Sequence, residues 1–503
     1  MEALDWLVIG VFFLALIGII VWVVRQKQND SADYFLGGRD ATWLAIGASI
    51  FASNIGSEHL IGLAGAGASS GMAMAHWEIQ GWMILILGWV FVPFYSRSMV
   101  YTMPEFLERR YNPQSRTILS VISLVSYVLT KVAVTVYAGG LVFQQVFGIK
   151  ELWGIDFFWI AAIGLVVLTA LYTIFGGMKS VLYTSVLQTP ILLLGSLIIL
   201  VLGFKELGGW DEMMRVCGAV TVNDYGDTMT NLIRSNDDAN FPWLGALIGS
   251  AIIGFWYWCT DQFIVQRVLS GKNEKEARRG TIFGAYLKLL PVFLFLIPGM
   301  IAFALHQKYI GAGGEGFLPM LANGTANADA AFPTLVAKLL PAGVKGLVVC
   351  GILAALMSSL ASLFNSSAML FTIDFYKRFR PETPEKKLVG IGQIATVVIV
   401  ILGILWIPIM RSVGDVLYTY LQDVQSVLAP GIAAAFLLGI CWKRTSAQGG
   451  MWGLIAGMVI GLTRLGAKVY YSNAGEVADS TFKYLFYDMN WLFFCGWMFL
   501  RRK

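Results

Sequence analysis

Long uninterrupted apolar runs alternate with short polar segments along the whole chain. Each run holds about 20 residues or more, the length that an α-helix needs to cross a hydrocarbon core of roughly 30 Å. Strands of a membrane barrel are shorter and alternate apolar with polar positions, so the pattern excludes a barrel. We predict an all-α integral membrane protein with about 13 transmembrane helices. The predicted spans are 5–24, 43–69, 75–100, 117–147, 154–175, 180–208, 241–266, 279–306, 344–376, 388–411, 417–442, 446–470 and 484–500.

The composition agrees with this class. The 503 residues are 57% apolar and only 13% charged, about half the charged share of a soluble domain. The first run lacks a basic lead and a small-residue cleavage site, so we predict a retained helix rather than a secretory signal. The 5 cysteines are scattered and indicate no disulfide framework. The net charge of +5 requires no nucleic acid, and the predicted partner is the lipid bilayer.

The orientation follows from the basic residues. Numbering the loops alternately places most Lys and Arg residues in one set, which includes 267–279 and 377–387. The opposite set contains longer Asn/Asp-rich segments, at about 204–240 and 307–343. By the positive-inside rule, we predict a multi-pass protein of the cell membrane (inner or plasma) with its N-terminus outside and its C-terminus in the cytoplasm.

Several charged or strongly polar residues fall inside the predicted spans. Each costs a few kcal/mol at membrane depth, so such residues mark a pathway or a site by default. A single one fits a buried ion pair or a snorkelling head group equally well, but several together indicate a polar cavity. These residues are Glu58, His59, Glu78, Lys131, Asp261, Lys288 and Gln422.

Two local patterns indicate where such a cavity forms. In ASNIGSEHLIGLAG, the run of Asn54, Gly56 and Ser57 is poor at forming helix, so the second span is expected to unwind there and free backbone carbonyls. A mild kink satisfied by a neighbouring helix is the alternative. In AALMSSLASLFNSS, the hydroxyls of Ser358 and Ser359 suit a hard cation such as sodium, although small residues also serve close helix packing.

A third pattern is aromatic. Trp256, Tyr257 and Trp258 lie in the middle of a predicted span rather than at an interface. Such rings can stack on a sugar while polar groups bond its hydroxyls. An ordinary aromatic core is the alternative.

At this point the chain resembles the sodium/solute symporter family, and within it most closely the sodium/glucose cotransporters. The resemblance runs from about residue 33 to 470 through specific motifs in order: FLGGR, ASNIGSEHLIGLAG, GWVFVPFY, TMPEFLERRY, WYWCTDQFIVQR, YLKLLP, AALMSSLASLFNSS, FTIDFYK and LAPGIAAAFLLGICWKR. It implies one membrane transport domain over 1–503 with a leucine-transporter-like core of two inverted five-helix repeats with broken helices. The repeats would be 43–208 and 241–442, with 1–42 and 443–503 peripheral.

The resemblance also implies the binding residues. Sodium would be held by the carbonyls of Ala52, Ile55 and Ala355 with the hydroxyls of Ser358 and Ser359. The sugar site would comprise Asn54, His59, Glu78, Tyr257, Trp258, Lys288 and Gln422, and the gates would be Leu63, Trp77 and Tyr418. A carboxylate, an ammonium and an amide can each bond vicinal hydroxyls.

Three positions depart from the family pattern. Gly254 stands where relatives often carry Asn or Thr near the sugar, Ser185 replaces an aspartate, and Ala361 lacks a hydroxyl near a proposed second sodium. We therefore predict one sodium per sugar. The implied function is sodium-coupled symport of a hexose, glucose and/or galactose, into the cell by alternating access.

Other functions stay open. Within transport, the solute could instead be myo-inositol or an organic anion. A membrane sensor or channel is a rival of another class and would accumulate nothing against a gradient. An enzyme is not predicted, because the sequence shows no nucleophile–base constellation, and His59, His76 and His306 are too dispersed for a metal site.

Overall fold

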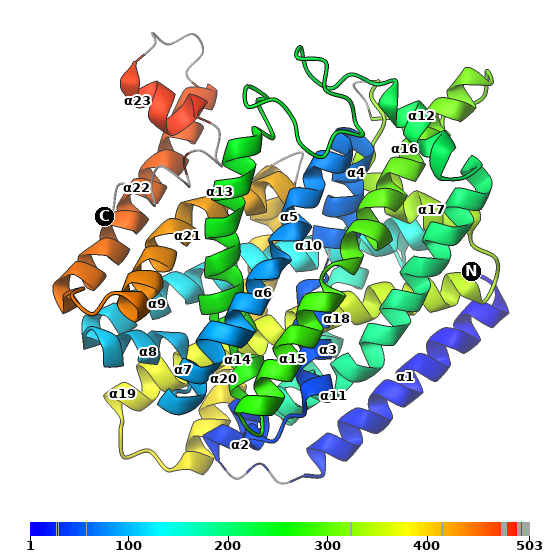
Figure 1. Ribbon diagram of the computed structural model, residues 1–503. Helices are drawn as coiled ribbons and strands as arrows, with labels where there is room; N and C mark the ends of the chain where they lie inside the picture. Colours follow the sequence, from blue (N-terminus) through cyan, green and yellow to red (C-terminus); the bar gives the residue numbers. More distant parts are fainter. Residues whose placement is uncertain are drawn as a thin grey trace.

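Helices of membrane-crossing length form nearly all of the structure, a computed structural model (Figure 1). It describes residues 1–503 except 27, 29, 57, 322–323, 414–416, 474–479, 490–493 and 495–503, and for 129, 145, 409–413, 417–424, 469, 472–473 and 487–488 it describes the backbone alone. Helices α1 (Ala3–Val24) and α22 (Ala447–Asn473) lie at opposite edges of the bundle (Figure 1).

Within the described residues, nine helical runs are long and apolar enough to cross a membrane, and two shorter apolar helices join them. The nine runs are Ala3–Val24, Glu58–Ser98, Pro113–Gln144, Phe157–Leu207, Trp243–Thr260, Glu274–Gly311, Val344–Phe379, Glu385–Pro408 and Ala447–Lys468. The shorter helices are Trp43–Asn54 and Gln425–Cys441. The run Phe157–Leu207 contains two of the spans that we predicted, and most of the last one, 484–500, lies outside the described residues.

The second span is interrupted where the sequence predicted. Helix α3 (Trp43–Asn54) ends at Asn54. The next residue, Ile55, has an extended backbone with φ −79° and ψ 102°. The chain then resumes in a π-helical turn, η2 (Glu58–Leu63), and α4 (Ala64–Ser70). Ser57, a part of the predicted break, lies outside the described residues.

The seventh predicted span is interrupted in the same way. Helix α13 (Trp243–Gly254) continues as the π-helical turn η7 (Phe255–Thr260). Asp261 is extended, with φ −74° and ψ 127°, and its side chain caps α14 (Gln262–Leu269) by accepting from the backbone N–H of Phe263. Interruptions of this kind free backbone carbonyls from the helix, and at membrane depth such groups line cavities or bind ions.

A glycine also sharply bends helix α11 (Phe157–Leu207). Gly177 has φ 53° and ψ −148°, and a Cβ there would lie 2.4 Å from the carbonyl oxygen of Tyr34. Only glycine fits both the positive φ and this close approach. The bend separates the two spans that the sequence predicted over this helix.

Small residues bring the broken second span close to one neighbour. Gly280, in α15 (Glu274–Leu287), lies where a Cβ would meet the Ile46 Cβ of α3 at 2.6 Å. Gly299, in α16 (Ile297–Gly311), lies where a Cβ would meet the Ala64 carbonyl oxygen at 1.9 Å. The halves on either side of the break therefore pack against successive parts of one long run, as small residues allow in membrane helices.

The remaining elements frame this core. Helix α18 (Val344–Met369) packs against α11 and α3, while α5 (His76–Ile79) and η4 (Gln80–Trp82) lie beside α13 (Figure 1). The other helices of the spans are α6 (Met83–Ile86), η5 (Leu87–Phe91), α7 (Val92–Ser98), α9 (Pro113–Ser126), η6 (Tyr127–Val132), α10 (Ala133–Phe147), η8 (Val292–Leu296), η10 (Leu370–Tyr376), α20 (Glu385–Val413) and α21 (Leu417–Cys441). The connecting elements are α2 (Ser31–Leu36), η1 (Gly37–Arg39), η3 (Gly71–Ala75), α8 (Met103–Arg110), the antiparallel pair β1 (Glu151–Leu152) and β2 (Ile155–Asp156), α12 (Trp210–Gly218), η9 (Ala328–Ala330), α17 (Ala331–Leu339), α19 (Lys377–Phe379), α23 (Thr481–Lys483) and η11 (Tyr484–Asp488).

Candidate functional site

A small polar cavity lies between the two interrupted spans. Its volume is about 30 Å³, which is room for one or two water molecules, so a sugar enters only if the lining side chains move. The lining comes from α3, η2, α5, η4, η7, α21 and the end of α15. The lining residues are Asn54, Glu58, His59, Trp77, Glu78, Gln80, Tyr257, Trp258, Lys288 and Gln425.

The Glu78 carboxylate and the side chains of Lys288 and His59 form a cluster in this cavity, which Glu58 also lines. The Lys288 ammonium lies 2.7 Å from Glu78 Oε2, and His59 Nε2 lies 3.2 Å from Glu78 Oε1. The Lys288 nitrogen is also 2.8 Å from His59 Nε2. Gly81 permits this arrangement, because a Cβ there would lie 2.6 Å from Lys288 Cγ. All three side chains are at most 4% exposed, so the Lys288 ammonium compensates the buried Glu78 carboxylate.

A hydrogen bond joins the two interrupted spans across the cavity. Asn54 Nδ2 donates to the Tyr257 hydroxyl at 2.8 Å. Asn54 lies one residue before the break in the second span, and Tyr257 lies in the π-helical turn before the break in the seventh. This hydrogen bond therefore holds together two segments that belong to different halves of the chain.

Several polar atoms at the cavity have no hydrogen-bond partner among the described residues. They include both donors and acceptors: Asn54 Oδ1, His59 Nδ1, Gln80 Oε1 and Trp258 Nε1. A buried polar atom without a partner costs roughly 1–3 kcal/mol, so such atoms rarely gather in one place without a reason. Their gathering suits a ligand that offers several hydroxyls, each able to donate and to accept.

The structure brings most of the predicted solute residues together. Asn54, His59, Glu78, Tyr257 and Lys288 all line the cavity. Trp258 and the predicted gate residue Trp77 line it as well, while the gate residue Leu63 is fully buried at the end of η2 outside the lining. Tyr418 and Gln422 belong to α21, but their side chains lie outside the described residues.

Sequence reasoning missed two amide side chains of the lining, Gln80 and Gln425. Gln425 is three residues after the predicted Gln422, and Gln80 is two residues after the predicted Glu78. Residues three apart lie on one face of a helix, so the spacing of Gln425 was a usable signal. Gln80 had no such signal, because it lies in a 3₁₀ turn.

The predicted sodium ligands lie at the break of the second span. Ala52 and Ile55 flank its last helical turn, and Ala355, Ser358 and Ser359 are buried on α18. The Ser359 hydroxyl lies 3.3 Å from the position that a Cβ of Gly56 would occupy, directly beside the break. These are neutral oxygens, and unwound carbonyls of this kind bind sodium in transporters. The assignment of these five residues to sodium stays a prediction.

Two of the predicted intramembrane charges serve elsewhere. The Lys131 ammonium pairs with Asp261 Oδ2 at 2.8 Å, and the Tyr127 hydroxyl donates to Asp261 Oδ1. Lys131 also lies over the Tyr257 ring, 4.6 Å from its centroid. This pair ties η6 to the break before α14. It does not line the cavity, so intramembrane charge alone does not identify the solute site.

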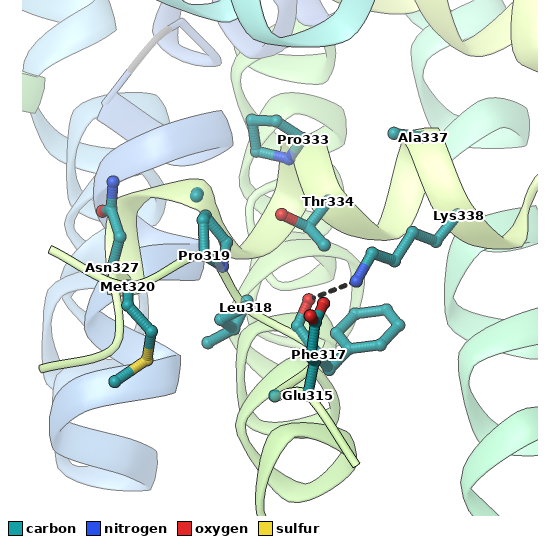
Figure 2. Close-up of a pocket in the computed structure, with 12 residues that line it drawn as sticks. Glu315, Phe317, Leu318, Pro319, Met320, Asn327, Pro333, Thr334, Ala337 and Lys338 are labelled. Carbon is teal, nitrogen blue, oxygen red and sulfur yellow. Dashed lines mark hydrogen bonds between the residues drawn. The ribbon is translucent and has the colours of Figure 1, made fainter. Parts of the chain in front are cut away.

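A larger cavity, of about 780 Å³, lies away from this cluster, between residues 315–320 and helix α17 (Figure 2). Its Lys338 donates to the Phe317 carbonyl at 2.8 Å and lies over the Phe317 ring (Figure 2). None of the predicted sodium or solute residues lines it. Cavity volume alone would therefore place the site here rather than at the smaller polar cavity. We assign the site to the smaller cavity because its polar groups can bind a solute.

Known proteins resemble the chain over nearly its whole length. "Sodium/myo-inositol cotransporter 2" of Homo sapiens is 38% identical over 479 residues, covering 92% of this chain and 70% of the relative. "Sodium/glucose cotransporter 2" of Rattus norvegicus is 38% identical over 512 residues, covering 97% and 75%. A solved structure, "Substrate-bound outward-open state of a Na+-coupled sialic acid symporter reveals a novel Na+-site", matches with a TM-score of 0.79 at 22% identity and covers 100% of this chain and 96% of that one.

The structural similarity confirms the leucine-transporter-like fold that the family resemblance implied. Residues 34–461 match the family described as "Sodium:solute symporter family". The chain is therefore a member of the sodium:solute symporter family, a membrane transporter that couples solute movement to sodium and is not an enzyme.

Proposed function

We propose that the protein carries a hexose, glucose and/or galactose, into the cell together with one sodium ion. The observation that carries this proposal is the gathering, around the Glu78, His59 and Lys288 cluster, of polar atoms that have no partner in the described part of the chain. A site built from a carboxylate, an ammonium and amides binds vicinal hydroxyls and rejects analogues that lack them. The face of Trp258, with the Lys288 ammonium 5.6 Å from its centroid, adds an aromatic surface for a sugar ring.

Sodium binding and solute binding would be coupled because the two proposed sites use adjacent residues of the chain. Ile55 would give its carbonyl to sodium, while its neighbour Asn54 holds Tyr257 at the cavity. Sodium bound at the break would fix this segment against α18 and thereby preorganise the solute site. An ion that orders a shared segment raises the affinity for the solute by the same factor that the solute raises the affinity for the ion.

The direction of transport rests on the proposed orientation, with the N-terminus outside and the C-terminus in the cytoplasm. Cys441, exposed at the end of α21, would then face the cytoplasm. In intact cells, a membrane-impermeant thiol reagent should leave a variant with Cys441 as its sole cysteine unlabelled. Labelling should follow permeabilisation, and labelling of intact cells would reverse the proposed orientation.

Myo-inositol is the second candidate solute. It is a ring of hydroxyl-bearing carbons that presents the same chemistry to the cavity, and the chain is as similar to a protein named for myo-inositol as to one named for glucose. A hexose and myo-inositol differ in the ring oxygen and one hydroxymethyl group. Competition between the two solutes for sodium-driven uptake distinguishes them.

The test is uptake of labelled glucose, galactose and myo-inositol into proteoliposomes that contain the purified protein. A tenfold inward sodium gradient supplies about 1.4 kcal/mol, and about 100 mV of potential adds about 2.3 kcal/mol per charge. One sodium per solute thus limits accumulation to roughly 500-fold, and two would roughly square this limit. Equal uptake with choline in place of sodium would refute the proposal.

A further inference from the structure

Gly254 leaves a space beside the cavity that another side chain fills. It is the last residue of α13, directly before the turn that carries Tyr257 and Trp258. A Cβ on Gly254 would lie 2.8 Å from Gln80 Oε1 and 3.3 Å from Gln80 Cβ. The Gln80 side chain therefore occupies the position that any larger residue at 254 would need.

Gln80 is placed to meet a solute. It lines the central cavity, two residues after Glu78 and next to Gly81, over which Lys288 passes. Its Oε1 is buried and has no hydrogen-bond partner among the described residues. A buried amide oxygen without a partner is costly, so its retention at a cavity of hydrogen-bonding groups indicates a ligand partner rather than a packing role.

Gln80 also has room to move away from the cavity. It lines a second, crevice-like cavity of about 500 Å³, together with His76, Ser250 and Phe255. Gln80 therefore lies between the two cavities. A group that pushed its amide outwards would move it towards this crevice.

We propose that Gln80 is a solute-binding residue that supplies, from the turn after Glu78, the hydrogen bond that Gly254 cannot make. Its amide accepts from one hydroxyl and donates to a neighbouring one, which selects a solute with vicinal hydroxyls. The pair of Gln80 and Gly254 then sets which hydroxyl of the ring is read. This inference rests on the proposed function, since it needs a polyhydroxylated solute in the cavity.

The first test measures equilibrium binding of labelled galactose, glucose and myo-inositol to the purified full chain in saturating sodium. Gln80→Met keeps the length of the side chain and removes its hydrogen bonds. We expect the Kd for the best-bound solute to rise about tenfold, with the sodium concentration for half-maximal binding within twofold of wild type. Ser250→Ala, which alters the second cavity alone, should bind like wild type.

Gly254→Ala gives an independent route to the same result, because its methyl group displaces the Gln80 amide. It should weaken binding about as much as Gln80→Met does, and the double variant should be no weaker than either single one, since both remove one contact. Gly164→Ala is the matched control, because a Cβ at Gly164 meets nothing within 4 Å. A double variant weakened about 100-fold, as additivity requires, would show that the two residues act separately and would overturn the pairing.

Deoxy analogues of the bound solute separate binding from packing. In wild type, loss of the hydroxyl that Gln80 contacts should weaken binding about tenfold, whereas in Gln80→Met the same analogue should bind no worse than the parent solute. Wild-type Kd in Gln80→Met, or equal sensitivity to every analogue in both proteins, overturns the inference while leaving the proposed function intact. A wild type that binds none of the solutes in sodium overturns the proposed function itself.

Discussion

Two buried pairs of lysine and carboxylate lie within the membrane-spanning part of the protein, and they are alike in geometry but not in surroundings. Lys288 lies 2.7 Å from Glu78, and Lys131 lies 2.8 Å from Asp261. The first pair lines a cavity beside partnerless polar atoms. The second is enclosed: Asp261 caps a helix and accepts from Tyr127, and Lys131 lies over the Tyr257 ring.

The difference shows that a buried ion pair can serve either stability or binding. The Asp261 pair is held by the Tyr127 hydroxyl and by aromatic rings, and it does not line the central cavity. The Glu78 pair does line this cavity, beside polar atoms that have no partner among the described residues and can therefore bond a solute. The residues that surround a charge, rather than the charge itself, therefore distinguish the two roles.

The largest effect on folding should come from the enclosed pair. Lys131→Met leaves the Asp261 carboxylate buried without its cation, which typically costs about 3–5 kcal/mol. We expect a strong fall in the thermal unfolding temperature of the purified protein. The double variant Lys131→Met with Asp261→Asn removes both charges, keeps a residue that can cap α14, and should recover most of the loss. A Lys131→Met variant as stable as wild type would contradict the structural role of this pair.

The open pair should respond in binding instead. Lys288→Met leaves Glu78 with a remaining polar partner, His59 Nε2 at 3.2 Å, so stability should fall less than in Lys131→Met. Solute affinity should fall about 100-fold, because truncation of a buried charged partner costs about 2–5 kcal/mol. Equilibrium binding with sodium titration separates the effects, and an equal loss of sodium and solute affinity would indicate a structural role for Lys288.

A neutral polar group sharpens the comparison further. Ser359→Ala removes one proposed sodium ligand at the break of the second span without leaving a charge behind. We expect the sodium concentration for half-maximal uptake to rise about tenfold, which corresponds to a loss of about 1.4 kcal/mol in sodium binding. The unfolding temperature should not change. Ser196→Ala, at another buried serine on α11, is the control. Unchanged sodium activation in Ser359→Ala would remove this residue from the ion site.

The same contrast explains what the sequence could predict. The spans that fall on the described residues and the break near Asn54 depend on local composition, so hydropathy and helix propensity predicted them correctly. The gathering of Asn54, Glu78, Tyr257 and Lys288 joins residues up to 234 positions apart, as 288 − 54 shows. Only the family resemblance, and no local pattern, placed them in one site.

Long-range packing accounts for what the sequence did not show. The partnership of Lys131 with Asp261 spans 130 residues, and nothing near either residue identifies the other. Gln80 occupies its position because Gly254 has no side chain. This contact depends on how two separate helical segments pack, so neither segment alone indicates it. The proposed repeat boundaries, 43–208 and 241–442, stay predictions.

A partly buried carboxylate outside the predicted spans, Asp329, should have the smallest energetic effect among these four predictions. Asp329, in η9, lies against Gly65, where a Cβ would meet its Oδ1 at 2.6 Å, and burial raises its pKa from 3.8 to about 6. The folded protein therefore holds the proton more tightly than the unfolded chain, so stability is fully present below about pH 4 and is lost as pH rises through about 6. A rise of two in the pKa corresponds to about 2.7 kcal/mol. Because Asp329 is partly exposed, water screens part of this energy. Asp329→Asn removes the loss and should therefore stabilise the protein at pH 7.5 by roughly 1 kcal/mol. Thermal unfolding at pH 4 and pH 7.5 checks this, with no gain expected at pH 4, and an equal gain at both values would show that hydrogen bonding by the new amide, and not the charge, is responsible.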